Sequence, residues 1–139
     1  MRILVAEDET IIRLDLRGLL ERAGYEIVAE ARDGEEAVAL AREHSPDLAV
    51  MDVKMPRLDG IEAARRILEE RPIPIVMLTA FDQRELVERA AEAGVYGYLV
   101  KPFREQDVVP AIELAKARHE ELQAVRADAD SLAQALADR

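Results

Sequence analysis

The sequence predicts an α/β fold, a doubly wound parallel sheet of five strands. Short apolar runs alternate with amphipathic stretches of helical periodicity five times along the 139 residues. Such runs are typical of strands covered on both faces, and βαβ units at this spacing close into a parallel sheet through right-handed crossovers. Acidic, hydroxyl or basic residues follow four of the runs. Open α/β sheets bind their ligands at this end of the strands.

The strands are predicted from apolar runs bounded by turn residues. Ile3 to Ala6 is continuously apolar, and Pro72 and Pro74 mark the start of the fourth run. The predicted strands are residues 3–6, 26–31, 48–51, 73–78 and 97–100.

The helices are predicted from caps and breakers. Gly24 and Gly94 each follow an amphipathic stretch, as glycine does at helix C-termini. Asp33 predicts an N-cap, because Glu36 completes a capping box, and Pro46 ends that helix. The predicted helices are residues 10–23, 33–45, 61–70, 84–93 and a last one from about 105 nearly to 139.

The last helix is about twice as long as packing on the sheet requires. Pro110 predicts a tightened or kinked first turn. Beyond His119, apolar residues recur at steps of three and four, as in a coiled-coil seam. We expect residues 119–139 to be a helical extension that pairs with a second copy in a homodimer; the alternative is a tail folded back on its own domain. The seam is Leu122, Val125, Ala129, Leu132 and Leu136.

Composition limits the classes of function. The length suits one domain, and no apolar stretch reaches the eighteen or so residues that a membrane span needs. We expect no signal peptide, because a strand pattern begins almost at Met1. The absence of cysteine excludes disulfides and thiolate metal sites, and is compatible with the cytoplasmic location that we expect. The formal net charge of −10 argues against direct binding of nucleic acid.

Four strand ends are predicted to place charged and hydroxyl groups at one edge of the sheet. Glu7 and Asp8 follow the first strand, Asp52 the third, Thr79 the fourth and Lys101 the fifth. Mg²⁺ prefers hard oxygen ligands, and clustered carboxylates without a cation disfavour one another's ionisation. These residues therefore predict a phosphoryl site with Mg²⁺ held by Glu7, Asp8 and Asp52.

This pattern resembles the receiver domain of two-component response regulators over residues 1–118. The resemblance is carried by the strand-end residues, by the run DVKMPRLDG at 52–60, and by the pairs Thr79-Ala80 and Lys101-Pro102. It implies a flavodoxin-like sheet of order 2-1-3-4-5. It also implies that Asp52 accepts a phosphoryl group from a sensor histidine kinase.

The resemblance also assigns roles to other residues. The backbone carbonyl of Lys54 would be a further Mg²⁺ ligand. Thr79, the backbone of Ala80, and Lys101 would bind phosphoryl oxygens, and Tyr98 would be the aromatic switch residue. Pro102 would follow a cis peptide. Phosphorylation would alter the face formed by the fourth helix, fifth strand and fifth helix, and with it dimerisation.

The output is implied by a narrower resemblance. The stretch YGYLVKPFRE at 96–105 and the charged continuation of the last helix are similar to regulators that carry an ANTAR module, a small helical RNA-binding antiterminator. This implies regulation of transcription antitermination, with no RNA bound by these residues themselves. The chain ends within the linker of that pattern, so we expect either a natural single-domain regulator or a piece of a longer one.

The alternatives to a phospho-acceptor are a flavin-binding domain, an aspartate-nucleophile phosphatase and an interaction module. A flavin-binding domain needs a phosphate loop rich in Gly, Ser and Thr, where Glu7, Asp8 and Glu9 would repel phosphate. An aspartate-nucleophile phosphatase typically has a second Asp two residues after the nucleophile, where this chain has Lys54. The third is an interaction module that is never phosphorylated and acts through its last helix. We expect no enzymatic activity beyond the domain's own phosphorylation and dephosphorylation.

Overall fold

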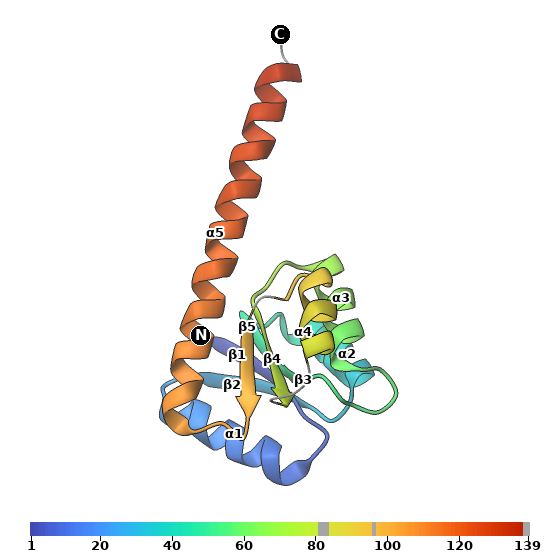
Figure 1. Ribbon diagram of the computed structural model, residues 1–139, viewed down its shortest axis with the longest axis vertical. Helices are drawn as coiled ribbons and strands as arrows, with labels where there is room; N and C mark the ends of the chain where they lie inside the picture. The colour runs from blue at the N-terminus through green and yellow to red at the C-terminus, as the bar shows by residue number, and fades with distance from the viewer. Residues whose placement is uncertain (81–83, 96, 138–139) are drawn as a thin grey trace.

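The computed structural model describes residues 1–80, 84–95 and 97–137. Five parallel strands form one sheet in the order β2-β1-β3-β4-β5, which confirms the predicted fold and strand order (Figure 1). The strands are β1 (Arg2–Ala6), β2 (Glu26–Ala31), β3 (Leu48–Asp52), β4 (Ile75–Ala80) and β5 (Gly97–Lys101). The helices are α1 (Thr10–Arg22), α2 (Gly34–His44), α3 (Gly60–Glu70), α4 (Arg84–Glu92) and α5 (Glu105–Ala137).

The sheet lies between two layers of helices because strand side chains alternate between its faces. Ile3 and Val5 of β1 pack in one apolar cluster with residues of α1 and α5. Leu4 and Ala6 pack in another cluster with residues of α2, α3 and α4 (Figure 1). The inner strands β1, β3 and β4 are buried over nearly their whole length, which explains their continuous apolar runs.

Two helices begin at side-chain caps. The carboxylate of Asp33 accepts a hydrogen bond from the backbone N–H of Glu36 at 2.8 Å, which confirms the predicted cap of α2. Asp59 accepts from the N–H of Glu62 at 2.8 Å and begins α3 in the same way. The cap at Asp59 ends the loop that follows Asp52, so the start of α3 is tied to the strand that carries this carboxylate.

Five strand ends differ from the prediction, among them the start of β1, one residue earlier at Arg2, and the end of β4, two residues later at Ala80. β4 begins at Ile75 rather than at residue 73, because Pro74 has no N–H to donate to a ladder. The carbonyl of Pro74 still accepts a hydrogen bond from the N–H of Ala49 at 3.1 Å. β3 and β5 extend by one residue, so that Asp52 and Lys101 are themselves the last residues of their strands. This fixes their backbones in the sheet.

The last helix, α5, is a continuous helix of 33 residues that is not interrupted at Pro110. Its first half packs on the sheet through Val108, Ile112 and Ala115. Its second half projects away from the rest of the domain (Figure 1). The last two residues of the predicted extension, 138–139, lie outside the described residues.

The described helices do not have the properties of membrane spans. None of them combines the length and the apolar character that crossing a membrane would need. The longest, α5, carries charged residues throughout its length.

Substitution of Gly60 should destabilise the domain. A Cβ atom at this position would collide with the backbone carbonyl of Asp52, which cannot move without disturbing β3. We expect Gly60→Ala to lower the free energy of unfolding by about 3 kcal/mol, as overpacking does in a rigid site. Urea denaturation followed by circular dichroism measures the change.

The matched control is Gly18→Ala, in the middle of α1. There a Cβ atom would meet the flexible end of the Arg22 side chain at 3.2 Å. Because alanine favours helix more than glycine does, this variant should be more stable by up to about 1 kcal/mol. Equal stability of the two variants would contradict the role given to Gly60.

Candidate functional site

The C-terminal ends of four strands meet at one edge of the sheet. Because β1, β3, β4 and β5 are parallel neighbours, Glu7, Asp52, Thr79 and Lys101 are all delivered to this edge. Asp8 follows Glu7 in the loop between β1 and α1. The parallel topology therefore brings these five residues to one edge of the sheet, as the sequence predicts.

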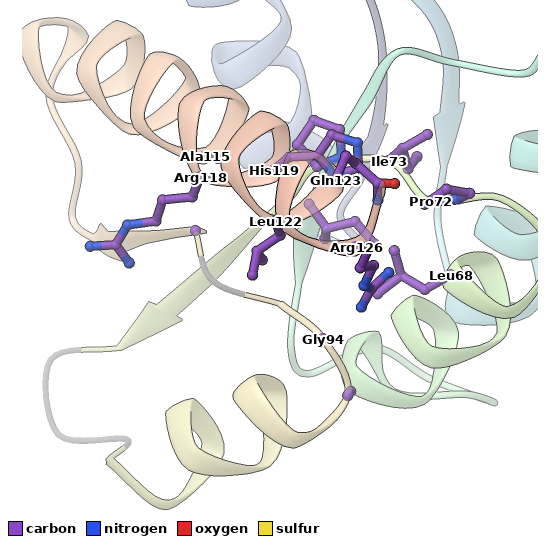
Figure 2. Close-up of a pocket in the computed structure, with 14 residues that line it drawn as sticks. Leu68, Pro72, Ile73, Gly94, Ala115, Arg118, His119, Leu122, Gln123 and Arg126 are labelled. Atoms are coloured by element: carbon purple, nitrogen blue, oxygen red, sulfur yellow. The ribbon is translucent and has the colours of Figure 1, made fainter. Parts of the chain in front are cut away.

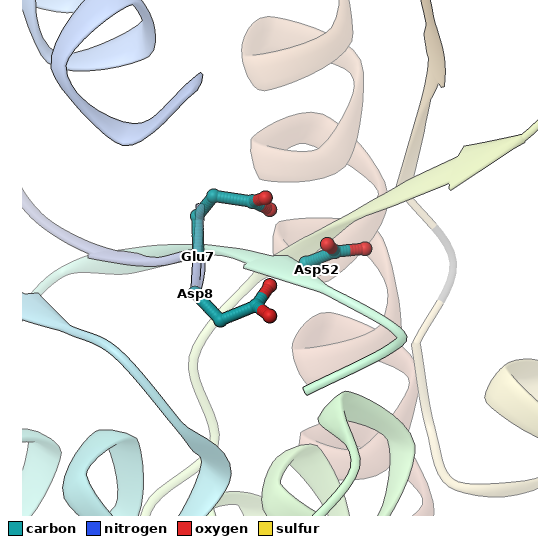
Figure 3. Close-up of side chains that lie close together, drawn as sticks. All are labelled: Glu7, Asp8 and Asp52. Atoms are coloured by element: carbon teal, nitrogen blue, oxygen red, sulfur yellow. The ribbon is translucent and has the colours of Figure 1, made fainter. Parts of the chain in front are cut away.

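Three carboxylates form the centre of the site. One oxygen from each of Glu7, Asp8 and Asp52 lies within 4.8 Å of the others (Figure 3). Glu7 is fully buried, Asp52 is 8% exposed, and Asp8 is exposed to solvent. The cluster is therefore closed on the protein side and open on the side of Asp8, as a site for a hydrated cation would be.

Burial changes the protonation of Glu7. Its loss of solvent, the hydrogen bond to Asp52 and the charge of Asp52 together raise the pKa of Glu7 to about 8, against the smaller lowering effect of Lys101. Among the described residues, none offers a hydrogen bond to the Glu7 Oε1 atom. A buried, unsatisfied oxygen on one of three clustered carboxylates fits a divalent cation well, because the cation would satisfy the oxygen and neutralise the cluster.

Lys101 lies against two of these carboxylates. Its ammonium nitrogen is 3.0 Å from Asp52 Oδ2 and 3.4 Å from Glu7 Oε2. Burial acts to lower the pKa of Lys101, but the hydrogen bonds and charges of Asp52 and Glu7 outweigh it and raise this pKa. Lys101 is therefore a permanent cation beside the Asp52 carboxylate. The peptide bond between Lys101 and Pro102 is cis, as the resemblance implied.

The loop after Asp52 covers one side of the cluster. It is closed by a 2.7 Å hydrogen bond from the N–H of Gly60 to the carbonyl of Val53. Lys54 lies in this loop, and with Asp8 it lines a shallow hollow on the solvent side. The hollow is also lined by Met55, Pro56, Asp59, Leu86 and Arg89. It leaves the open face of the carboxylate cluster accessible.

The proposed switch residues lie beside the site. Thr79 is 3% exposed in β4, and Ala80 pairs with Lys101 in the ladder between β4 and β5. The Tyr98 side chain is half-buried, with its hydroxyl 2.9 Å from the carbonyl of Val95 and 3.1 Å from that of Val87. The Tyr98 hydroxyl therefore links β5 to α4. Tyr96, part of the stretch that resembles ANTAR regulators, lies outside the described residues.

Arg13 is a further residue at the site, and the strand-end pattern does not predict it. The guanidinium of Arg13 in α1 donates a 2.8 Å hydrogen bond to the backbone carbonyl of Glu7. A signal for it exists in the sequence, because Arg13 lies three residues before Leu16 and seven before Leu20. Both leucines are fully buried, so Arg13 is a charged residue on the inward stripe of α1.

The predicted seam of α5 is remote from the carboxylate cluster. Leu122 lines a groove with Leu68 and Gly94 at the other edge of the sheet, where β4 and β5 begin (Figure 2). Its exposed fraction is 38%, against 64% for Val125 and 63% for Leu132. Ala129 and Leu136 are exposed as well. Beyond Leu122 the seam is thus an apolar stripe open to solvent.

Comparison with known proteins identifies the family. A family model described as response regulator receiver domain matches residues 3–113. The chain is 56% identical over 138 residues to the transcriptional regulatory protein PdtaR of Mycobacterium tuberculosis (strain ATCC 25618 / H37Rv), covering 99% of this chain and 67% of that protein. It is 40% identical over 112 residues to the chemotaxis protein CheY of Bacillus subtilis (strain 168), covering 80% and 93% respectively.

Solved structures give the same result. A two-component response regulator of the LuxR family from Aurantimonas sp. SI85-9A1 is similar with a TM-score of 0.78 and 40% identity, covering 84% of each chain. A CheX-CheY-BeF3-Mg complex from Borrelia burgdorferi is similar with a TM-score of 0.76 and 27% identity, covering 81% of this chain and 86% of that one. The family model spans most of the chain, and it shows that the chain belongs to the response regulator receiver domain family.

Proposed function

We propose that this domain accepts a phosphoryl group on Asp52 from the phosphohistidine of a sensor kinase, in a reaction that requires Mg²⁺. The observation that carries the proposal is the group of Glu7, Asp8 and Asp52 oxygens within 4.8 Å of one another, with the Lys101 ammonium 3.0 Å from Asp52. Membership of the receiver family and the similarity to a CheY that was crystallised with BeF3 and Mg support it.

The transfer needs little covalent chemistry from the protein. An oxygen of Asp52 attacks the phosphorus, the P–N bond to the imidazole breaks, and the electron pair leaves with the imidazole, so that an acyl phosphate forms. The protein then has to position the reacting groups and to neutralise the negative charge of the phosphoryl group. Mg²⁺ held by Glu7, Asp8, Asp52 and the Lys54 carbonyl would neutralise charge on the phosphoryl oxygens.

The other residues act on the same phosphoryl group. The Lys101 ammonium would move from Asp52 to a phosphoryl oxygen, a step that is favourable because it remains a cation throughout. The Thr79 hydroxyl and the backbone N–H of Ala80 would bind another oxygen. Movement of Thr79 toward the phosphate would let the Tyr98 ring shift and release its hydroxyl from the carbonyls of α4 and its following loop.

The output proposed for such a receiver is regulation of gene expression. The relative from Mycobacterium tuberculosis is described as a transcriptional regulatory protein, and this chain spans 67% of its length. Where the receiver is joined to an ANTAR module, phosphorylation would control an RNA-binding antiterminator. A receiver acting without such a module is the second candidate, because the chain matches a CheY over 93% of that protein's length.

Residues 119–139 are proposed as a dimerisation element that follows a receiver of residues 1–118. The exposed seam on α5 carries four large apolar side chains and one alanine, and isolated helices of this length are marginal in water. Pairing with a second copy would cover the seam, and two-fold dimers are the commonest assembly. The same exposed helix is what favours the interaction module as an alternative function.

The first prediction from this function concerns the acceptor. With acetyl phosphate and Mg²⁺, the intact chain should gain one phosphoryl group, measured by mass spectrometry under conditions that preserve acyl phosphates. Asp52→Asn should gain none, and Asp8→Ala should react more slowly by at least about tenfold because it loses a proposed metal ligand. Equal labelling of Asp52→Asn would rule out the assignment. A chain that never reacts, even with a kinase, would favour the interaction module.

The second prediction concerns stability and pH in the absence of metal. Between pH 4.5, the ordinary pKa of Glu7, and about 8, its folded value, the folded chain holds a proton that the unfolded chain has released. Stability should therefore fall as pH rises through this interval, with a slope of about 1 kcal/mol per pH unit from Glu7. Denaturation in EDTA at several pH values measures the slope. Glu7→Gln should flatten it, whereas Glu9→Gln, at the exposed position two residues away, should leave it unchanged.

The third prediction concerns the extension. Leu122→Glu/Leu132→Glu places two charges in the seam and should abolish a weak, concentration-dependent dimer seen by sedimentation. The control Ala124→Glu/Ser131→Glu adds the same charges at exposed positions outside the seam and should still dimerise. Phosphorylation should change the dimer affinity by a factor equivalent to about 1–3 kcal/mol. Native chains that stay monomeric at every concentration would contradict the coiled-coil proposal.

A further inference from the structure

The loop that carries Glu7 and Asp8 is held from outside the carboxylate cluster. α1 begins directly after it, but the Glu9 side chain at the N-cap makes no capping hydrogen bond to the described residues. The first turn of α1 also contains no acidic residue that could replace the cap. Within the described chain, the ordering of this loop must therefore come from other contacts.

Arg13 supplies one such contact. Its guanidinium nitrogen Nη1 lies 2.8 Å from the backbone carbonyl oxygen of Glu7, and its side chain is only 11% exposed. The carbonyl of Glu7 belongs to the peptide bond that joins Glu7 to Asp8. A hydrogen bond to this oxygen therefore fixes the plane of the peptide between the two carboxylate-bearing residues, and with it the directions in which their side chains leave the backbone.

Arg13 is itself held in place from the neighbouring strand. Its Nε atom lies 3.7 Å from Glu30 Oε1, and Arg17 binds the other oxygen of Glu30 at 2.6 Å. Glu30 is paired with Val5 in the ladder between β2 and β1. Glu30 in β2 and the Glu7 carbonyl just after β1 thus hold the Arg13 guanidinium from two sides, which leaves it little freedom to rotate.

We infer that Arg13 is a positioning residue for the metal site: it orients the peptide between Glu7 and Asp8 so that their carboxylates converge with that of Asp52. The inference rests on the proposed Mg²⁺ site. Arg13 itself contacts no carboxylate of the cluster in the described structure; its contacts are the Glu7 carbonyl and Glu30.

The charge of Arg13 and its positioning role predict opposite effects on Mg²⁺ affinity when the side chain is removed. A cation near three carboxylates repels Mg²⁺, so the loss of its charge alone would tighten metal binding. Loss of positioning would weaken binding, because misdirected ligands must be reordered by the metal. We expect positioning to dominate, with a Kd for Mg²⁺ raised about tenfold in Arg13→Ala, a typical cost of losing a residue that orients metal ligands.

The experiment compares Mg²⁺ titrations of intact folded chains, followed by ¹⁵N NMR shifts at the site. The matched control is Arg17→Ala, which removes the same charge and also a partner of Glu30, but no contact to the Glu7 carbonyl. It should bind Mg²⁺ within about threefold of the native Kd, since distant surface charges are largely screened. Arg13→Lys, which can still donate to the carbonyl, should recover part of the lost affinity.

A second readout separates positioning from general loss of structure. With acetyl phosphate, Arg13→Ala should reach the native rate of phosphorylation at saturating Mg²⁺, with only the half-saturating Mg²⁺ concentration raised. A merely destabilised domain would lower the rate at every Mg²⁺ concentration in proportion to its unfolded fraction, and circular dichroism would show that fraction.

The titrations separate a failure of the Mg²⁺ site from a failure of the role of Arg13. A native chain that binds no Mg²⁺ would overturn the metal site and the role of Arg13 together. If the native chain binds Mg²⁺ and Asp8→Ala does not, the site stands. Native-like or tighter binding by Arg13→Ala would then overturn the positioning role alone, as would equal weakening in Arg13→Ala and Arg17→Ala.

Discussion

The crowding of Glu7, Asp8 and Asp52 within 4.8 Å is the constraint on which the site depends. Two like charges about 4 Å apart repel by about 4 kcal/mol at the effective dielectric constant of a protein surface. Two features of the protein itself relieve this repulsion. The pKa of Glu7 rises to about 8, and Lys101 lies against both Glu7 and Asp52. Because a cation sharing these oxygens would make both adjustments unnecessary, the cluster suits the proposed Mg²⁺.

Holding such a cluster together requires a rigid frame, and the frame is made of backbone. Asp52 is the last residue of a strand that pairs on both sides, so its position is set by β1 and β4. Gly60 brings the start of α3 so close to the Asp52 carbonyl that no Cβ fits between them. Arg13 holds the Glu7 carbonyl from α1. Each of these contacts uses a main-chain atom, which leaves the carboxylate oxygens available for a ligand.

The order of strands and helices along the chain was enough to predict which residues lie together at the site. The C-terminal ends of parallel strands share one edge of the sheet, irrespective of side-chain conformation. What it could not predict is the environment of each group. Glu7 is fully buried and Asp8 is exposed although they are neighbours, since burial depends on which side of the edge each one faces. Similarly, the contact of Arg13 with Glu30 and that of the Tyr98 hydroxyl with the Val87 carbonyl join different elements, and the periodicity within one element carries no information on such contacts.

The seam of α5 and the face that packs on the sheet are parts of one stripe. Ala115, buried on the sheet, lies one heptad before Leu122, and a heptad step returns to nearly the same face of a helix. This explains why Leu122 is less exposed than Val125: its groove is shared with Gly94, beside Val95. The Val95 carbonyl lies 2.9 Å from the Tyr98 hydroxyl. The groove that Leu122 lines with Gly94 is therefore bordered by the segment whose carbonyl the Tyr98 hydroxyl contacts. The proposed movement of Tyr98 would therefore reach Val95 and the groove beside it, where the proposed pairing of a second helix would begin at Leu122.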